Sequence, residues 1–155
     1  MKIAVIQIRG GTHLSPDIKK TFDLLNLRRK NSCIILDNSP LYLGMVVKIR
    51  DYVTWGEINE ETLKELIEKR GRTAGNKLLT EEYLKQNLKI TISELTKSLI
   101  SGKIKMKDVP GLKKYFRLTP PKGGYEKKGI KKQYSIGGAL GYRKEAINIL
   151  LKKMM

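Results

Sequence analysis

The residues best suited to chemistry in this sequence are cations gathered in its second half. Residues 101–134 hold eleven lysines and arginines against two acids, Asp108 and Glu126. Cations at this density neutralise phosphates, because each one releases a counterion from a polyanion. Balanced protein surfaces mix the two signs, so the pattern predicts a nucleic-acid-binding surface. The eleven cations are Lys103, Lys105, Lys107, Lys113, Lys114, Arg117, Lys122, Lys127, Lys128, Lys131 and Lys132.

The charge of the whole chain points the same way. The formal net charge is +17, from 32 basic and 15 acidic side chains among 155 residues. Residues 1–80 carry 14 basic and 9 acidic side chains, whereas residues 81–155 carry 18 and 6. Self-repulsion of this size favours a phosphate-rich partner, nucleic acid first and an anionic membrane second. No apolar run approaches the roughly 20 residues of a spanning helix, and no signal peptide is visible, so we expect a cytoplasmic protein without a membrane partner.

Candidates for catalysis and metal binding are few. The single histidine, His13, follows the first predicted strand, and the single cysteine, Cys33, has no partner for an intramolecular disulfide. No cysteine and histidine spacing typical of a metal site occurs. Most carboxylates occupy predicted helix first turns, where they stabilise the helix dipole. We therefore expect no catalytic residue, metal, cofactor or small-molecule substrate.

Two glycine-rich turns could approach a phosphate through their backbone. Gly10-Gly11-Thr12 lies between a predicted strand and a predicted helix, but no lysine and serine or threonine follow as in a phosphate loop. It is either a plain turn or a backbone contact to phosphate. Gly137-Gly138 precedes the last predicted helix and indicates a close approach to RNA or to a neighbouring loop.

Much of the cationic segment lacks the pattern of a helix or strand. Pro120-Pro121 and repeated glycines interrupt regular structure between residues 116 and 141. Such a chain buries little apolar surface, so the sequence predicts an arm that stays unfolded until it meets RNA. Tyr125 and Tyr134 either stack on unpaired bases or pack on the protein's own core; both interpretations stay open.

The first 58 residues must position this arm. Alternation predicts strands over Lys2 to Arg9, Cys33 to Leu36 and Tyr52 to Gly56. Ser15-Pro16 and Ser39-Pro40 are typical helix starts, and apolar spacing predicts helices after each. The order β-α-β-α-β indicates an α+β fold, with both helices on one face of a compact sheet.

Three further segments follow. Residues 59–102 are predicted as a helical extension, in which Thr91 and Glu94 have the spacing of a capping box. Residues 103–141 form the predicted basic arm, and residues 142–155 return to helix. The arm is therefore tethered at both ends, as a long loop.

Short pieces along nearly the whole chain match one family in order and spacing. They are Ile8-Arg9-Gly10, Ser15-Pro16, Leu24 to Arg28, Gly44-Met45, Trp55-Gly56, Glu65 to Gly71, Leu118 to Gly124, Gly137-Gly138, Gly141, Arg143 to Glu145 and Ile147-Asn148. With these pieces the chain resembles the archaeal and eukaryotic branch of the large-subunit ribosomal protein L-thirty family. It begins directly at its first strand, without a long basic N-terminal extension, which resembles an archaeal member.

The resemblance implies a β-α-β-α-β core with a three-stranded antiparallel sheet, loosely ferredoxin-like, and a C-terminal extension. It implies a non-catalytic ribosomal protein that, as a monomer, holds large-subunit rRNA beside neighbouring ribosomal proteins. The alternatives are a chromatin-type coat of DNA or RNA and, less favoured, an RNA-processing enzyme. The RNA contacts expected from charge and backbone exposure are Arg9, Gly10, Gly11, Lys19, Arg28, Arg29, Lys30, Lys48, Arg50, Arg70, Arg72, Lys77, Arg117, Lys122, Gly123, Gly124, Tyr125, Lys127, Lys128, Lys131, Lys132, Tyr134, Gly137, Gly138 and Arg143.

Overall fold

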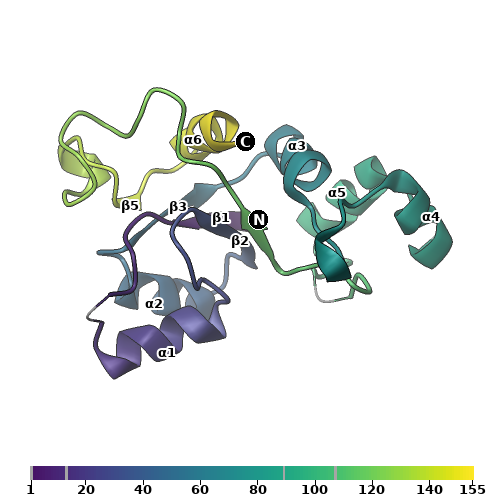
Figure 1. Ribbon diagram of the computed structural model, residues 1–155, viewed down its shortest axis with the longest axis horizontal. Coiled ribbons are helices and arrows are strands. Elements are labelled where there is room, and N and C mark those ends of the chain that lie inside the picture. Colours follow the sequence, from purple (N-terminus) through teal and green to yellow (C-terminus); the bar gives the residue numbers. More distant parts are fainter. Residues whose placement is uncertain (1, 13, 89, 107) are drawn as a thin grey trace.

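The fold is α+β, as the sequence predicts, with a sheet between two layers of helices (Figure 1). The structure is a computed structural model, and it describes residues 2–12, 14–88, 90–106 and 108–155. His13 and Lys107 therefore lie outside the described residues. Within them the α-helices are α1 (Pro16–Leu24), α2 (Pro40–Lys48), α3 (Glu60–Arg70), α4 (Glu81–Leu88), α5 (Ile92–Ile100) and α6 (Ala146–Met154). The strands are β1 (Lys2–Gln7), β2 (Ser32–Asp37), β3 (Val53–Glu57), β4 (Tyr115–Arg117) and β5 (Gly141–Tyr142).

The centre of the sheet is the predicted antiparallel unit, but the sheet has five strands and not three. Their order is β4-β2-β1-β3-β5, with β1 antiparallel to both β2 and β3. The two added edge strands lie at the two ends of the predicted unfolded segment, and Tyr142 of β5 corrects the prediction that the helix begins at residue 142. β4 is antiparallel to β2, and β5 is parallel to β3. Strands of three and two residues carry too little periodicity to be found from sequence.

One face of the sheet is covered by α1 and α2, as predicted. Ile3, Val5 and Trp55 from the strands share a core with Phe22 of α1 and Val46 of α2. Serine begins both helices, although only Ser39 caps with its side chain, accepting a hydrogen bond from the Tyr42 backbone N–H at 3.4 Å. Burial of these apolar side chains supplies the main stabilising free energy of this layer.

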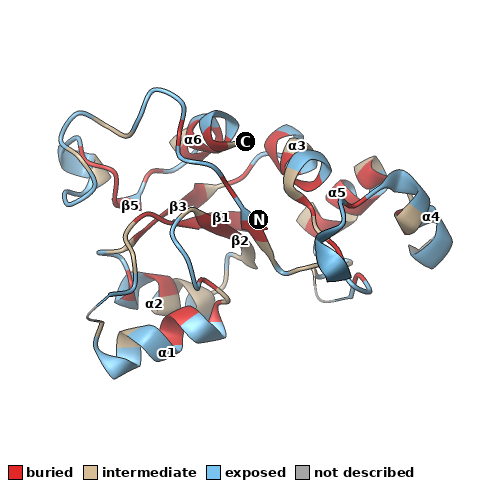
Figure 2. Ribbon diagram, in the orientation of Figure 1, coloured by how far each residue is buried: buried red, intermediate tan, exposed pale blue. Residues whose placement is uncertain are grey.

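The second face is covered as well, which the sequence analysis underestimated. Every residue of β1 is buried, and Ala4 and Ile6 belong to the same hydrophobic cluster as residues of helices α3, α5 and α6 (Figure 2). Leu63, Leu95 and Ile147, one from each of these helices, are fully buried in the same cluster. The predicted capping box at the start of α5 is confirmed: the Glu94 carboxylate accepts from the Thr91 N–H at 2.8 Å. The helical extension and the C-terminal helix are thus part of one continuous core.

The arm is folded onto this body, which corrects the expectation of an unfolded segment. Leu118 and Leu140 are buried, and the Thr119 and Lys122 N–H groups donate to the last turn of α6. Within the arm, the Ala139 N–H donates to the Gly129 carbonyl at 3.1 Å, and the Leu140 N–H donates to the Lys132 carbonyl at 3.1 Å. These bonds satisfy backbone groups that would otherwise need water. Sequence reasoning missed them because they join residues 8 to 10 apart without a regular period.

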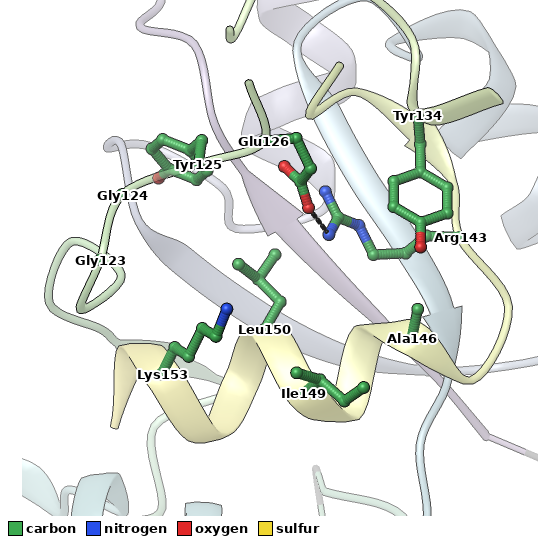
Figure 3. A pocket seen from close by; sticks show the side chains of 10 residues that line it. All are labelled: Gly123, Gly124, Tyr125, Glu126, Tyr134, Arg143, Ala146, Ile149, Leu150 and Lys153. Atoms are coloured by element: carbon green, nitrogen blue, oxygen red, sulfur yellow. Dashed lines mark hydrogen bonds and ion pairs between the residues drawn. The ribbon is translucent and has the colours of Figure 1, made fainter. Parts of the chain in front are cut away.

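A buried arginine fastens the arm to the sheet. The Arg143 guanidinium donates to Thr54 Oγ1 at 2.8 Å and to the Ala139 carbonyl at 2.9 Å, and it pairs with the Glu126 carboxylate (Figure 3). Its Cζ also lies 4.6 Å from the centre of the Tyr134 ring. Arg143 is 3% exposed. We call Thr54, Glu126, Tyr134, Ala139 and Arg143 the Arg143 cluster.

Close backbone packing gives a first prediction. A Cβ at Gly56 would lie 2.0 Å from the Lys144 carbonyl oxygen, which is backbone and cannot turn away. Gly56→Ala should therefore lower the free energy of unfolding by about 3 kcal/mol. Gly44→Ala is the matched control: Gly44 lies inside α2, and a methyl group added there would have nothing within 4 Å, so alanine should add about 0.5–1 kcal/mol. Urea unfolding measures both, and equal midpoints for the two variants would contradict the packing described.

The Arg143 cluster gives a second prediction. Arg143→Met leaves the Glu126 carboxylate without its partner, so it should cost about 3 kcal/mol of unfolding free energy. Amide hydrogen exchange on the RNA-free protein should show protected Ala139 and Leu140 amides in the unsubstituted chain and fast exchange in the variant. Arg50→Met, which removes an exposed arginine outside the cluster, should change neither measurement. Unprotected amides at both positions in the unsubstituted chain would restore the expectation of an unfolded arm.

Candidate nucleic-acid interface

The lysines of the arm face outward on a fixed backbone. Lys127, Lys128, Lys131 and Lys132 are all exposed, and none lies within 4 Å of a carboxylate in the described part of the chain. The Lys128 N–H donates to the Gly137 carbonyl at 3.3 Å, and the Lys132 carbonyl accepts from Leu140. Two lysine pairs are thereby held on neighbouring turns. Such a group can neutralise phosphates without first ordering its backbone.

Several predicted contacts outside the arm are exposed cations as well. Lys30 lies beside the turn formed by Gly10 and Gly11. If Gly10 carried a Cβ, that atom would lie 2.8 Å from the Lys30 Cε. This places a lysine next to the exposed Gly11 and the half-buried Arg9. The remaining exposed lysines of the predicted set outside the arm are Lys19, Lys48 and Lys77, and Lys122 is a further exposed lysine inside the arm.

Three of the predicted arginines meet at one place. Arg28 and Arg29 from the loop before β2, and Arg117 from β4, line a single pocket of about 230 Å³. Asn26, Ser32 and Tyr115 complete its lining and were not predicted as contacts. The pairing of Ser32 with Arg117 across β2 and β4 brings these distant residues together. A sequence signal existed only for the loop, where two asparagines, which adopt positive φ more readily than most residues, flank the arginine pair.

Other predicted arginines are engaged by the protein itself. Arg9 donates to the Asp51 carbonyl at 3.1 Å and lies over the Tyr52 ring, with its Cζ 5.0 Å from the ring centre. Arg70 donates to the Met155 carbonyl at 2.6 Å, and Arg72 donates to the Asn76 carbonyl at 3.3 Å. Arg50 is exposed with its Nε 3.9 Å from Asp51 Oδ1. Arg9, Arg70 and Arg72 therefore fasten chain segments in addition to carrying charge, whereas Arg50 joins no separate segments.

The arm's aromatic and buried residues have internal roles. Tyr125 is half-buried, and its hydroxyl donates to Asn31 Oδ1 at 3.0 Å, whereas Tyr134 lies under the Arg143 guanidinium. The structure thus favours packing over base stacking for both rings. The burial of Arg143 argues against the RNA contact expected for it. Gly138 is buried where a Cβ would meet the Lys132 carbonyl oxygen at 2.1 Å, so the backbone at Gly138 closely approaches a neighbouring loop of the protein.

A pocket of about 200 Å³ lies between the arm and α6 (Figure 3). Gly123 and Gly124 form its rim, both with positive φ, and Leu150 and Lys153 of α6 form the opposite side. The ionic groups at its inner end are Glu126 and Arg143, which neutralise each other. This junction braces the arm and offers no nucleophile with an adjacent base.

The described residues show no arrangement typical of a metal site. Within residues 2–12, 14–88, 90–106 and 108–155, no three histidine, cysteine or acidic side chains gather at a common point. Cys33 is buried, and burial raises the pKa of its thiol far above the ordinary value, which suppresses the reactive thiolate. None of the helices in this part of the chain has the length and apolarity needed to cross a bilayer.

Comparison with known proteins identifies the family. Residues 3–53 match the family model described as ribosomal protein L30p/L7e. The chain is 50% identical to the large ribosomal subunit protein uL30 of Methanococcus vannielii over 155 residues, which is the full length of both chains. It is 44% identical to the uL30 of Methanopyrus kandleri over 149 residues, covering 96% of this chain and all of that protein. Identity to the uL30 of Nanoarchaeum equitans is 48% over 148 residues, covering 96% and 95% of the two chains.

These relatives are archaeal and match the arm and α6 as well as the sheet, so the resemblance seen in the sequence extends over the whole fold. The chain belongs to the L30p/L7e family of large ribosomal subunit proteins and is similar along all of its 155 residues to an archaeal uL30.

Proposed function

We propose that this chain is a non-catalytic structural protein of the large ribosomal subunit, which holds rRNA in place through cations on a rigid support. Its relatives are named as large ribosomal subunit proteins, which supports rRNA and neighbouring ribosomal proteins as partners. The single observation that carries the proposal is the outward-facing lysine group of the arm, Lys127, Lys128, Lys131 and Lys132, which is held by backbone hydrogen bonds and has no carboxylate within 4 Å among the described residues.

Each segment of the chain has a part in this proposal. Residues 1–58, with β1, β2 and β3 and two helices, form the ferredoxin-like core that sets the geometry. Residues 59–102 and 142–155 cover its second face, and residues 103–141 present the RNA-contacting arm. The protein acts as a monomer within the ribosome and uses no cofactor, membrane or small-molecule substrate. The proposed contacts are the exposed cations Lys19, Arg28, Arg29, Lys30, Lys48, Lys77, Arg117, Lys122, Lys127, Lys128, Lys131 and Lys132.

The salt dependence of rRNA binding tests the role of the arm. If about eight phosphates are neutralised, the logarithm of affinity should fall against the logarithm of salt concentration with a slope of about −6 to −7. The double variant Lys127→Gln/Lys128→Gln removes two contacts, so the slope should become shallower by about 1.5. Filter binding of large-subunit rRNA at a series of salt concentrations measures it.

The matched control is Lys64→Gln/Lys69→Gln on α3. These two lysines lie within 4 Å of Glu68 and Glu65 respectively, so they are already partnered. The control should keep the slope of the unsubstituted protein. An equal change of slope in both double variants would contradict the proposal that the arm lysines contact rRNA.

Sedimentation of the tagged protein from a cell lysate tests the class of function. We expect recovery with the large ribosomal subunit at moderate salt, because many phosphate contacts act together. A chromatin-type coat would instead sediment with DNA, and duplex DNA would compete for binding as well as large-subunit rRNA does. Either of these results would overturn the proposal.

A further inference from the structure

The pocket between the β2 loop and β4 has a lining unlike the rest of the surface. Its volume is about 230 Å³, and its walls are Asn26, Arg28, Arg29, Ser32, Tyr115 and Arg117. Three of these six residues are arginines, and none is acidic. The lysines of the arm, by contrast, project from an exposed surface. This is a concave site with convergent positive charge.

The fold holds the two loop arginines in a fixed turn. Asn26 and Asn31, with φ of 59° and 61°, bound the turn on both sides. The Leu27 N–H donates to the Phe22 carbonyl at 2.9 Å, and the Ser32 N–H donates to the Arg29 carbonyl at 3.2 Å. The turn is therefore tied to α1 at its start and closed on itself at its end.

The third arginine is placed by the register of the sheet. Arg117 pairs with Ser32 across β2 and β4, and the next residue, Leu118, donates its N–H to the Asn31 carbonyl at 2.9 Å. Because successive side chains of a strand point to opposite faces, a shift of one residue would replace Arg117 with apolar Phe116 or Leu118. Phe116 is fully buried in the core, which holds the register.

The three guanidinium groups have little compensation within the protein. Arg28 Nε is 3.7 Å from Asp23 Oδ1, but both side chains are more than half exposed, so this ion pair contributes little. Arg29 and Arg117 have no carboxylate within 4 Å among the described residues. Like charges at one pocket repel, and a bound anion removes that repulsion. The planar guanidinium fork matches the paired oxygens of a phosphate.

We propose that this pocket binds one backbone phosphodiester of RNA, with Tyr115 against the attached ribose or base. The proposal rests on the proposed function and adds to it a discrete nucleotide site at the β2–β4 edge. Tyr115 is half-buried: one side of it packs on the core, and it also lines the pocket. An aromatic wall beside a phosphate site is the usual arrangement for recognising single-stranded RNA. Asn26 and Ser32 add neutral hydrogen-bonding groups to the same wall.

Amide chemical shifts of the full chain, titrated with three small probes, test the proposal. The probes are the dinucleoside phosphate UpU, its uncharged methylphosphonate analogue, and inorganic phosphate. UpU should shift amides in residues 26–32 and 115–117 and saturate, and the uncharged analogue should not. Inorganic phosphate should bind the same residues more weakly, because it lacks contact with Tyr115. Equal binding of UpU and inorganic phosphate would overturn the assignment to RNA, and no saturable shift in these residues would overturn the site.

Variants separate the pocket from the general charge. Arg29→Gln/Arg117→Gln should weaken UpU binding about tenfold, since two solvent-exposed charge contacts with the phosphate are lost. Tyr115→Leu, which keeps all three arginines, should remove the preference for UpU over inorganic phosphate. Lys64→Gln/Arg50→Gln is the matched control, with the same loss of charge at exposed positions outside both the pocket and the proposed contacts, and should leave UpU binding unchanged. If the control variant weakened UpU binding equally, the binding would depend on non-specific positive charge and not on the pocket.

Binding of large-subunit rRNA to the same proteins distinguishes the two proposals. If UpU fails to bind while rRNA binds with the expected salt dependence, the pocket proposal is wrong and the proposed function stands. If rRNA itself fails to bind, the proposed function is wrong, whatever UpU does.

Discussion

The burial of one guanidinium, that of Arg143, determines how the second half of this chain folds. A buried charge is costly unless its donors are paired, and Arg143 finds partners on three separate segments. Thr54 belongs to β3, Glu126 to the middle of the arm, and Ala139 to the arm's return. The Arg143 N–H also donates to the Trp55 carbonyl at 2.9 Å, which continues the short pairing of β5 with β3. The path of the arm follows from these partners, since each must lie within hydrogen-bond distance of the same side chain.

The two kinds of cation in this protein have different structural roles. The arginines at positions 9, 70, 72 and 143 donate to backbone carbonyls or pair within the protein, whereas the arm lysines are exposed. Guanidinium groups offer several donors in a fixed plane and are weakly hydrated, so they suit buried or half-buried junctions. Ammonium groups are strongly hydrated and flexible, so they remain at the surface. Arg28, Arg29 and Arg117 are the exception, because they are gathered at a pocket whose lining includes no acidic residue.

The sequence predicts those parts of the fold that depend on local patterns. The partial alternation in β1 and the serine–proline starts of α1 and α2 were enough to predict the strands and helices of the core. The spacing of Thr91 and Glu94 was enough to predict the capping box of α5. The order of the arm depends on pairs that are remote in sequence, such as Thr54 with Arg143, 89 residues apart. The glycine, proline and lysine content of the arm suggested disorder, because amino-acid composition contains no information about contacts between residues that are remote in sequence. The same limit applies to the site: charge identified Arg29 and Arg117 separately, but only the register of β2 and β4 brings them together.

A folded arm changes what RNA binding requires. A disordered cationic segment loses backbone entropy when it binds, at about 1–2 kcal/mol for each residue that becomes fixed. Here the backbone hydrogen bonds of Gly129, Lys132, Ala139 and Leu140 are already formed in the protein alone, so chiefly the lysine side chains remain to be ordered. The folded backbone then sets the separations of the lysine attachment points, and an RNA backbone must match them within the reach of the side chains to be neutralised at every lysine. Specificity for a folded RNA can therefore come from the geometry of the protein, without hydrogen bonds to base edges.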